Sequence, residues 1–281
     1  MTEVRLGLIG DNIARSKSPL LHVEAGRLSG LAVSYERLVP ADLALGFEAV
    51  FERCREGGFH GINITYPYKE QVVPLVRIND PLVARIGACN TVLFSGPTPA
   101  GYNTDHSGFA AAYRGGFGTK EPGTVAMAGA GGVGKAIAFA LTALEARQLR
   151  LFDPHHARAA ALARAIDAAA TGMAVEVCSD IAQAVSGADG LINCTPLGMT
   201  GQPGSAVPAS LMATARWAFD AVYTPVETEF LKDARAAGIE VMSGYELFFH
   251  QGVHAFRLFT GREVDQQALR DALAELKSER A

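Results

Sequence analysis

The chain has 281 residues, of which 49% are hydrophobic and 19% are charged, and its formal net charge is −4. This composition predicts about two folded domains with packed cores, and it excludes an intrinsically disordered chain. The mild negative charge argues against a nucleic-acid partner, because proteins that bind nucleic acids usually carry a basic face.

The sequence shows no targeting or membrane signal. The first residues include Glu3 and Arg5, which leave too short an apolar run for a signal peptide. Lys135 interrupts the best apolar window, so no membrane span is expected. The four cysteines lack a C-x-x-C pair, and they predict neither a zinc site nor a disulfide framework. We therefore expect a cytoplasmic protein with reduced thiols.

Short apolar runs alternate with amphipathic stretches through the first hundred residues. The runs at 4–10 and 61–65 predict strands, and the stretches at 19–30 and 43–58 predict helices. The first of these helices has a proline in its first turn and a glycine just past its end. Strand–helix alternation of this kind predicts βαβ units and a parallel sheet.

The second half of the chain repeats this alternation. A stretch rich in glycine and proline at 115–124 predicts a domain boundary, and residues 124–146 then change from a strand to a glycine turn and a helix. Further strands are predicted at 149–153, 190–196 and 217–223, and helices at 157–170, 244–261 and 264–279. The predicted fold class is α/β.

The glycine turn has the spacing G-x-G-x-x-G. It comprises Gly129, Ala130, Gly131, Gly132, Val133 and Gly134. In this pattern the first glycine allows a tight turn, the second lets the backbone approach a pyrophosphate, and the third lets helix and strand pack closely. Because the turn lies between a predicted strand and a predicted helix, it predicts dinucleotide binding rather than a purely structural turn.

Asp153 follows the last of these glycines by nineteen residues, at the end of the next predicted strand. An acid at this place accepts hydrogen bonds from the adenosine ribose, and its charge repels the 2′-phosphate of NADP. Asp153 therefore predicts NAD as the cofactor, unless it only caps a helix. The nearby His155, His156 and Arg158 leave a weaker use of NADP open.

Four short polar motifs follow predicted strands or precede predicted helices in the first 109 residues. They are "RSKSP" (15–19), "NITYPYKE" (63–70), "GACNT" (87–91) and "GYNTDHSGF" (101–109). Each is compatible with ordinary turns when taken singly. Together they predict a pocket for a ligand rich in hydroxyl groups.

These motifs, with "GAGGVGKA", "NCTPLGM" and "GYELFFHQGVHAFRLFTG", resemble the shikimate/quinate dehydrogenase family in order along almost the whole chain. The resemblance implies a substrate-binding and catalytic α/β domain at 1–106, a Rossmann NAD(P)-binding domain at 107–245, and a cleft between them. It also implies that helices in 246–281 pack back on the first domain. The implied reaction is reversible hydride transfer between a nicotinamide and a ring carbinol of a hydroxylated cyclohexane or cyclohexene carboxylate.

The same resemblance implies that Lys69 and Asp105 form the catalytic pair. Hydride leaves a carbinol carbon only as the hydroxyl proton is removed, so a base must lie within hydrogen-bond reach. A lysine ammonium facing a carboxylate suits this task, and the sequence leaves open which of the two is the formal base.

The resemblance implies further contacts to the substrate and to the cofactor. The implied substrate-binding residues are Ser16, Ser18, Thr65, Asn90, Tyr223 and Gln251. The two serines would hold the carboxylate of the substrate, and Thr195 and Gly244 would lie near the nicotinamide half of the cofactor. His250 and His254 are spaced i, i+4, but without a third ligand beside them we expect no metal site.

Two departures from the common family pattern bear on specificity. The stretch "FDPHH" stands where NADP-dependent biosynthetic enzymes usually carry an Asn-Arg-Thr stretch, and Arg15 stands where a histidine usually begins the serine motif. The first departure favours an NAD-preferring quinate/shikimate dehydrogenase. We also expect a monomer or homodimer whose partner is a small-molecule substrate. An NADP-dependent shikimate dehydrogenase, an aminoshikimate-type enzyme and a nucleotide-sensing paralogue without activity are the alternatives.

Overall fold

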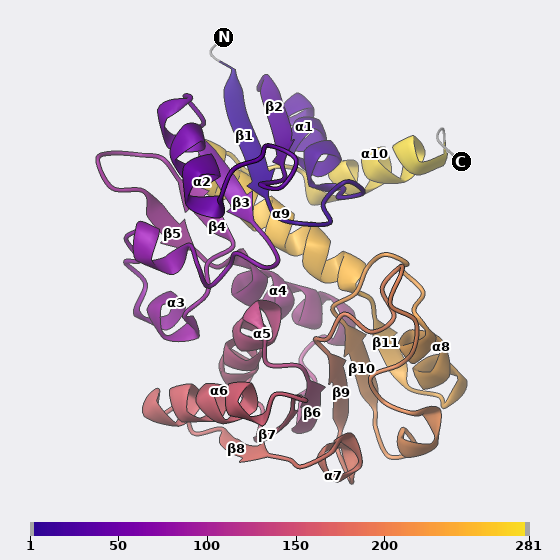
Figure 1. Cartoon of the computed structure of the whole chain (residues 1–281). Coiled ribbons are helices and arrows are strands. Elements are labelled where there is room, and N and C mark those ends of the chain that lie inside the picture. Colours follow the sequence, from indigo (N-terminus) through magenta and orange to yellow (C-terminus); the bar gives the residue numbers. More distant parts are fainter. Residues whose placement is uncertain (1–2, 279–281) are drawn as a thin grey trace. The chain divides into compact units, whose positions relative to one another are not determined.

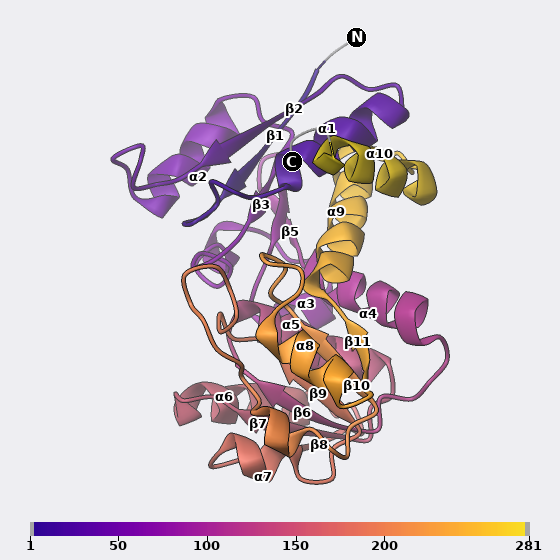
Figure 2. The same cartoon turned by 90° about the vertical axis from the view of Figure 1, so that its right-hand side faces the viewer.

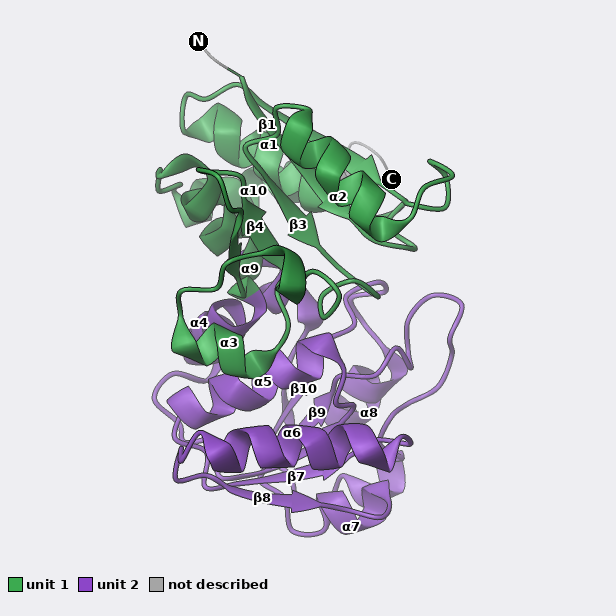
Figure 3. Ribbon diagram, turned by 60° about the vertical axis from the view of Figure 1, so that its left-hand side comes forward, with its two compact units in different colours: residues 1–104, 251–281 green, residues 105–250 purple. Residues whose placement is uncertain are grey.

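The computed structural model describes residues 3–278 and divides the chain into two compact units (Figure 3). The first unit is formed by the chain up to Thr104 together with the chain from Gln251 onward, and the second unit by Asp105–His250. Two helices, α4 (Thr104–Phe117) and α9 (Gly244–Thr260), continue from one unit into the other.

The first unit contains a five-stranded sheet with the order β2-β1-β3-β4-β5. Its strands are β1 (Val4–Ile9), β2 (Val33–Leu38), β3 (Gly61–Ile64), β4 (Thr91–Leu93) and β5 (Ala100–Tyr102). β1 pairs in parallel with β2 and β3, whereas β4 pairs antiparallel with both of its neighbours. The strands predicted at 4–10 and 61–65 are β1 and β3.

Helices cover this sheet. The first unit holds α1 (Ser18–Leu28), α2 (Phe47–Glu56), η1 (Val73–Leu75), α3 (Pro81–Ile86) and α10 (Gln266–Ser278). α10 packs against α1 (Figure 2). The helix predicted from residue 43 begins later, because Ala44 has a φ of 53° and cannot belong to a regular helix. Residue 279, at the end of the last predicted helix, lies outside the described residues.

The second unit is built on a six-stranded sheet with the order β11-β10-β9-β6-β7-β8, and every pair in it is parallel. Its strands are β6 (Thr124–Ala128), β7 (Gln148–Phe152), β8 (Ala174–Val177), β9 (Gly190–Asn193), β10 (Trp217–Asp220) and β11 (Glu240–Met242). The strand order reverses between β6 and β9 (Figure 1). In open parallel sheets ligands bind beyond the carboxyl ends of the strands at such a reversal.

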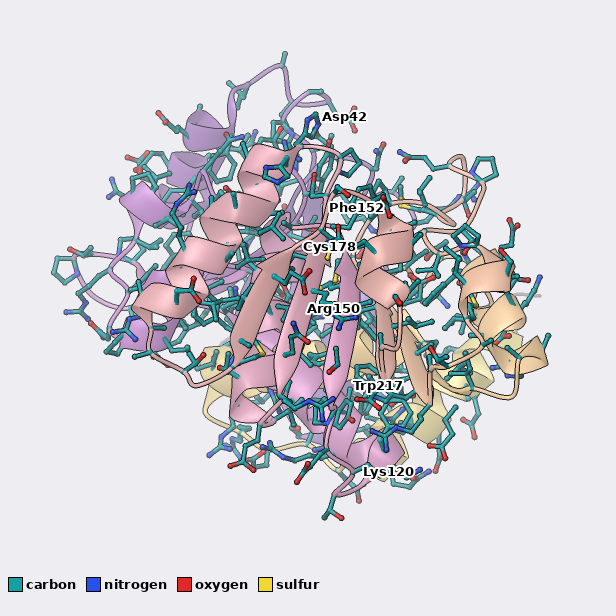
Figure 4. The ribbon with its side chains drawn as sticks, turned by 90° about the horizontal axis from the view of Figure 1, so that it is seen from below. Asp42, Lys120, Arg150, Phe152, Cys178 and Trp217 are labelled. Atoms are coloured by element: carbon teal, nitrogen blue, oxygen red, sulfur yellow. The ribbon has the colours of Figure 1, made fainter. Side chains whose placement is uncertain are left out.

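The second unit also contains α5 (Gly132–Ala143), α6 (His156–Ala168), α7 (Ile181–Val185), η2 (Ala209–Leu211) and α8 (Glu229–Ala236). Figure 4 shows Phe152 and Cys178 at the carboxyl edge of the sheet, with Trp217 and Lys120 toward the opposite edge. The stretch predicted as a boundary is helical up to Phe117, and Gly118 ends the helix with a φ of 65°. The predicted α/β class with a Rossmann domain is confirmed.

None of the helices within residues 3–278 is both long and apolar enough to cross a membrane. In the same part of the chain no three His, Cys, Asp or Glu side chains gather as a metal ion would require.

Candidate cofactor and substrate sites

The glycine turn joins β6 to α5 at the reversal of strand order. Gly129 has a φ of 98°, and a Cβ atom there would lie 2.8 Å from the carbonyl of Cys194. At Gly134 a Cβ atom would lie 2.3 Å from the carbonyl oxygen of Gly129, so helix and turn pack backbone against backbone. A Cβ at Gly131 would meet nothing within 4 Å. The two tight positions shape the turn, and the open one leaves room for a ligand.

This turn can hold the pyrophosphate of a dinucleotide. Gly131 is the N-cap of α5, and the first turn of that helix carries no acidic residue. The unpaired N–H groups and the positive end of the helix dipole favour an anion at this terminus. A pyrophosphate group therefore matches both the charge and the space that the turn provides.

Asp153 fixes the glycine turn to the end of β7. Its side chain is 9% exposed, and its two oxygens accept 2.8 Å hydrogen bonds from the backbone N–H groups of Ala130 and His155. A carboxylate oxygen accepts more than one hydrogen bond, so Asp153 retains capacity for ribose hydroxyls. The sequence did not predict its bond to the glycine turn. His155, His156 and Arg158 are exposed.

Thr195 lies against the glycine turn, because a Cβ atom on Gly129 would come within 3.0 Å of its backbone nitrogen. Its N–H and its hydroxyl both donate to Asn193 Oδ1, at 2.9 and 2.7 Å. The amide NH₂ of Asn193 donates to Asp220 Oδ1 at 2.9 Å. Thr195 is therefore held in place through Asn193.

Asp220, at the end of β10, is a buried carboxylate that the sequence did not single out. It is 0% exposed, and desolvation by this burial raises its pKa to about 6, although hydrogen bonds from Thr228, Val222 and Asn193 oppose the shift. The only signal in the sequence was an acid closing the apolar run "WAFD". Gly244 packs nearby, since a Cβ there would lie 2.6 Å from the carbonyl oxygen of Ala221.

Asn90 belongs to a cluster of hydrogen-bonded polar side chains in the first unit. Its Oδ1 accepts from the backbone N–H of Thr104 at 2.7 Å and from the hydroxyl of Thr91 at 3.0 Å. Because a backbone N–H can only donate, this contact fixes the orientation of the amide. The other polar group of this side chain is the NH₂, which can only donate hydrogen bonds.

Three other predicted residues are linked to Asn90 by the chain or by hydrogen bonds. The Thr104 hydroxyl, which also contacts Asn90 Oδ1, lies 3.5 Å from Gln251 Oε1. Asp105 is the next residue along the chain and is 5% exposed. The carbonyl oxygen of Lys69 accepts from the N–H of Cys89 at 2.8 Å, which ties the lysine segment to the segment of Asn90.

Ser16 and Ser18 lie together before α1. Their hydroxyl oxygens are 3.2 Å apart, and Arg37 fixes the loop by donating to the carbonyl oxygen of Ser16 at 2.7 Å. Arg15 is exposed. Thr65 packs on Gly10, where a Cβ atom would come within 2.2 Å of its methyl group.

Tyr223, the remaining predicted substrate residue, lies in the second unit. Its ring stacks on Phe248, with 5.1 Å between the ring centroids.

Asn63, near the end of β3, holds the backbone of Asn90 in place by a hydrogen bond. Its NH₂ donates to the carbonyl oxygen of Asn90 at 3.2 Å and to the hydroxyl of Thr91 at 3.0 Å, while its Oδ1 accepts from Tyr35 at 2.8 Å. The ring of His22 stacks on that of Tyr35, with 4.9 Å between their centroids, and complete burial lowers the pKa of this histidine to about 3. His22 is therefore neutral at physiological pH.

The six-stranded parallel sheet, its glycine turn and the buried acid after β7 define a dinucleotide-binding oxidoreductase. Two family models match the chain: the shikimate dehydrogenase substrate binding domain at residues 8–92, and the shikimate 5′-dehydrogenase C-terminal domain at residues 244–274. The chain belongs to the shikimate dehydrogenase family, which confirms the resemblance seen in the sequence.

Relatives of both cofactor types are similar to this chain. A quinate/shikimate dehydrogenase (NAD(+)) of Corynebacterium efficiens is 41% identical over 274 residues, which cover 95% of this chain and 96% of the relative. A shikimate dehydrogenase (NADP(+)) of Streptomyces avermitilis is also 41% identical, over 278 residues that cover 96% and 95%.

Two solved structures have the same architecture over nearly their whole length. Quinate dehydrogenase from Corynebacterium glutamicum in complex with NAD has a TM-score of 0.88 and 35% identity, and the match covers 98% of this chain and 100% of that one. Shikimate 5-dehydrogenase from Thermus thermophilus, in complex with NADP(H) and shikimate, has a TM-score of 0.84, 33% identity and coverages of 97% and 99%.

Proposed function

We propose that this chain is an NAD-dependent dehydrogenase that interconverts quinate with 3-dehydroquinate and shikimate with 3-dehydroshikimate. The observation that carries the choice of cofactor is Asp153, a buried carboxylate bound to the glycine turn at the end of β7. A carboxylate there accepts hydrogen bonds from ribose hydroxyls and repels a 2′-phosphate. NAD, when bound, supplies the hydride acceptor. Relatives of both cofactor types are 41% identical to this chain, so the choice between NAD and NADP rests on Asp153.

We assign cofactor binding to the six residues of the glycine turn (129–134), Asp153, Thr195 and Gly244. The N–H groups at the start of α5 would hold the pyrophosphate, and Asp153 would hold the adenosine ribose. Thr195 and Gly244 would line the nicotinamide end. The domains would be 1–106 with the helices of 246–281, and 107–245.

The substrate would be held by residues that the sequence placed in short polar motifs. The hydroxyls of Ser16 and Ser18 suit a carboxylate, since both can donate hydrogen bonds. The fixed NH₂ group of Asn90 suits a ring hydroxyl, as do Thr65, Gln251 and Tyr223. All are neutral, which suits a substrate with one charge and several hydroxyl groups.

Lys69 and Asp105 would act on the reacting hydroxyl. The lysine ammonium would stabilise the developing alkoxide, and the pair would take the proton as hydride leaves the ring carbon. Neither residue needs a metal ion for this chemistry. We also propose that the protein is cytoplasmic, since all four cysteines are buried as free thiols. We further propose that it is a monomer or homodimer and that it binds only small molecules.

Initial-rate kinetics test this proposal. Quinate and shikimate are each oxidised with NAD and with NADP, using the wild type and Asp153→Ala. We expect NAD to give the higher kcat/KM in the wild type, and the variant to lose at least tenfold of that preference. An NADP preference in the wild type would instead favour a shikimate dehydrogenase like the one from Streptomyces avermitilis.

A further inference from the structure

Asp220 collects hydrogen bonds from three separate segments of the second unit. Its Oδ1 accepts from Asn193 Nδ2 and from the backbone N–H of Val222, both at 2.9 Å, and its Oδ2 accepts from the hydroxyl of Thr228 at 2.6 Å. Asn193 ends β9, Val222 lies in the turn after β10, and Thr228 is the N-cap of α8. One buried carboxylate therefore joins two strand ends and a helix start.

The first of these bonds leads to the cofactor turn. The NH₂ group of Asn193 donates to Asp220 Oδ1 at 2.9 Å and to the carbonyl oxygen of Leu197 at 3.0 Å. Asn193 therefore presents its Oδ1 to Thr195, which donates to it from both N–H and hydroxyl at 2.9 and 2.7 Å. Thr195 itself packs against the glycine turn, because a Cβ atom on Gly129 would lie 3.0 Å from the backbone nitrogen of Thr195. Asp220, together with the carbonyl oxygen of Leu197, thus fixes the orientation of the amide that holds the segment against the glycine turn.

The second bond leads to the turn that carries Tyr223. Gly244 packs on the same turn, since a Cβ atom there would lie 2.6 Å from the carbonyl oxygen of Ala221 and 2.7 Å from that of Val222. Tyr223 directly follows Val222 and stacks on Phe248 at a centroid distance of 5.1 Å. Thr195, Tyr223 and Gly244 are therefore all placed by segments that Asp220 holds.

We propose that Asp220 is the positioning residue for the nicotinamide end of the cofactor site, an inference that rests on the proposed dehydrogenase function. Hydride transfer depends steeply on alignment, and misplacement by about 1 Å can lower a rate about a hundredfold. A buried carboxylate costs free energy by desolvation, and an apolar side chain of similar size would fill the same space. Unlike an apolar side chain, the carboxylate accepts hydrogen bonds from Asn193, Val222 and Thr228 and so fixes their positions.

Kinetics with quinate and NAD, together with the fluorescence anisotropy of bound NADH, test the proposal. We expect Asp220→Ala to lower kcat at least twentyfold while the KM for NAD changes less than fivefold, because the glycine turn and Asp153 still hold the adenosine half. The anisotropy of bound NADH, which reports the mobility of the nicotinamide ring, should fall. Asp220→Asn keeps an acceptor for Asn193, so its kcat should stay within threefold of the wild type.

Asp189→Asn is the matched control. Asp189 also accepts a backbone hydrogen bond, from Thr124 at 2.8 Å, but at the amino ends of β6 and β9. Its kcat should stay within twofold of the wild type. A folded Asp220→Ala with kcat within twofold of the wild type would overturn the proposal, as would an equal loss in Asp189→Asn.

Asn193→Ser covers the case in which Asp220→Ala does not fold. It removes the link to Thr195 while Asp220 keeps Val222 and Thr228, and we expect at least a tenfold loss of kcat. Unchanged kcat in folded Asn193→Ser would refute the proposed route. Wild-type turnover of quinate or shikimate tests the proposed function separately. If neither is oxidised, the anisotropy of bound NADH still decides the role of Asp220, with equal values in wild type and Asp220→Ala counting against it.

Discussion

Each unit of the molecule has a buried polar centre at the end of a strand, but the two centres differ in chemistry. In the first unit Asn63 both donates and accepts: its Oδ1 accepts from Tyr35, and its NH₂ group donates to Asn90 and Thr91. In the second unit Asp220 only accepts, from three donors. An amide centre has no charge to titrate, whereas a carboxylate centre does.

This difference has consequences for how each centre responds to pH. The centre around Asn63 contains a titratable group at its edge, His22, which must stay neutral because it is completely buried. The centre around Asp220 contains the titratable group itself. The two centres should therefore lose stability in opposite directions of pH, which makes the comparison testable.

The largest expected effect follows from removing the amide centre. Asn63→Leu keeps the size of the side chain but removes its hydrogen bonds, so that the buried polar groups of Tyr35, Asn90 and Thr91 each lose a partner. Each unsatisfied buried group costs about 1–3 kcal/mol, so we expect the free energy of unfolding to fall by about 4 kcal/mol. Urea denaturation at pH 7 measures it. Asn79→Leu, at an exposed position, is the control. A loss below about 1 kcal/mol would mean that Asn63 is not the centre of this cluster.

Much of this architecture could be predicted from local sequence, but neither polar centre could. The glycine turn was readable because its three glycines and its flanking strand and helix all lie within a continuous stretch. Besides Val222, which is two residues away, the partners of Asp220 lie 27 residues before it and eight residues after it, and those of Asn63 are 27 and 28 residues away. No periodicity connects residues so distant, so only the pairing of strands brings them together.

In the first unit, the strands that the sequence did not predict have a related cause. β4 and β5 have three residues each, too few to show an alternating pattern, and β2 contains the charged pair Glu36 and Arg37 in "VSYERL". Their positions depend on pairing with neighbours. The sequence placed Asp153 correctly at the end of β7. Its hydrogen bond to Ala130 could not be predicted, because the two residues are 23 positions apart and only the folded structure brings them together.

An intermediate effect is expected from His22 in acid. Its pKa is about 3 in the folded protein and 6.5 when exposed, so unfolding takes up a proton as the pH falls below 6.5. Stability that is fully present above pH 6.5 is progressively lost toward pH 3, by about 3 kcal/mol at pH 4.5. The ring stacks on Tyr35 at 4.9 Å, so His22→Phe retains an aromatic ring there.

Urea denaturation of both proteins at pH 7 and pH 4.5 measures this contribution. The wild type should lose about 3 kcal/mol more than His22→Phe over that interval. His60→Phe is the control, because His60 is exposed. Equal losses in the wild type and His22→Phe would show that the buried ring takes no part in acid unfolding.

The smallest expected effect is the opposite trend at Asp220. Its pKa is about 6 in the folded protein against 3.8 when exposed, so the folded state keeps a proton that the unfolded chain releases between these values. This contribution is fully present below pH 3.8 and is lost as the pH rises through 6. Between pH 5 and pH 7 the loss amounts to about 1 kcal/mol. Asp220→Asn cannot ionise, so the difference in stability between the two proteins should change by that amount across the interval.

If the wild type and Asp220→Asn instead keep a constant difference from pH 5 to pH 7, the carboxylate is ionised throughout. The hydrogen bonds from Asn193, Val222 and Thr228 would then outweigh its desolvation. In that case only the centre around Asn63, through His22, would respond to pH in this range.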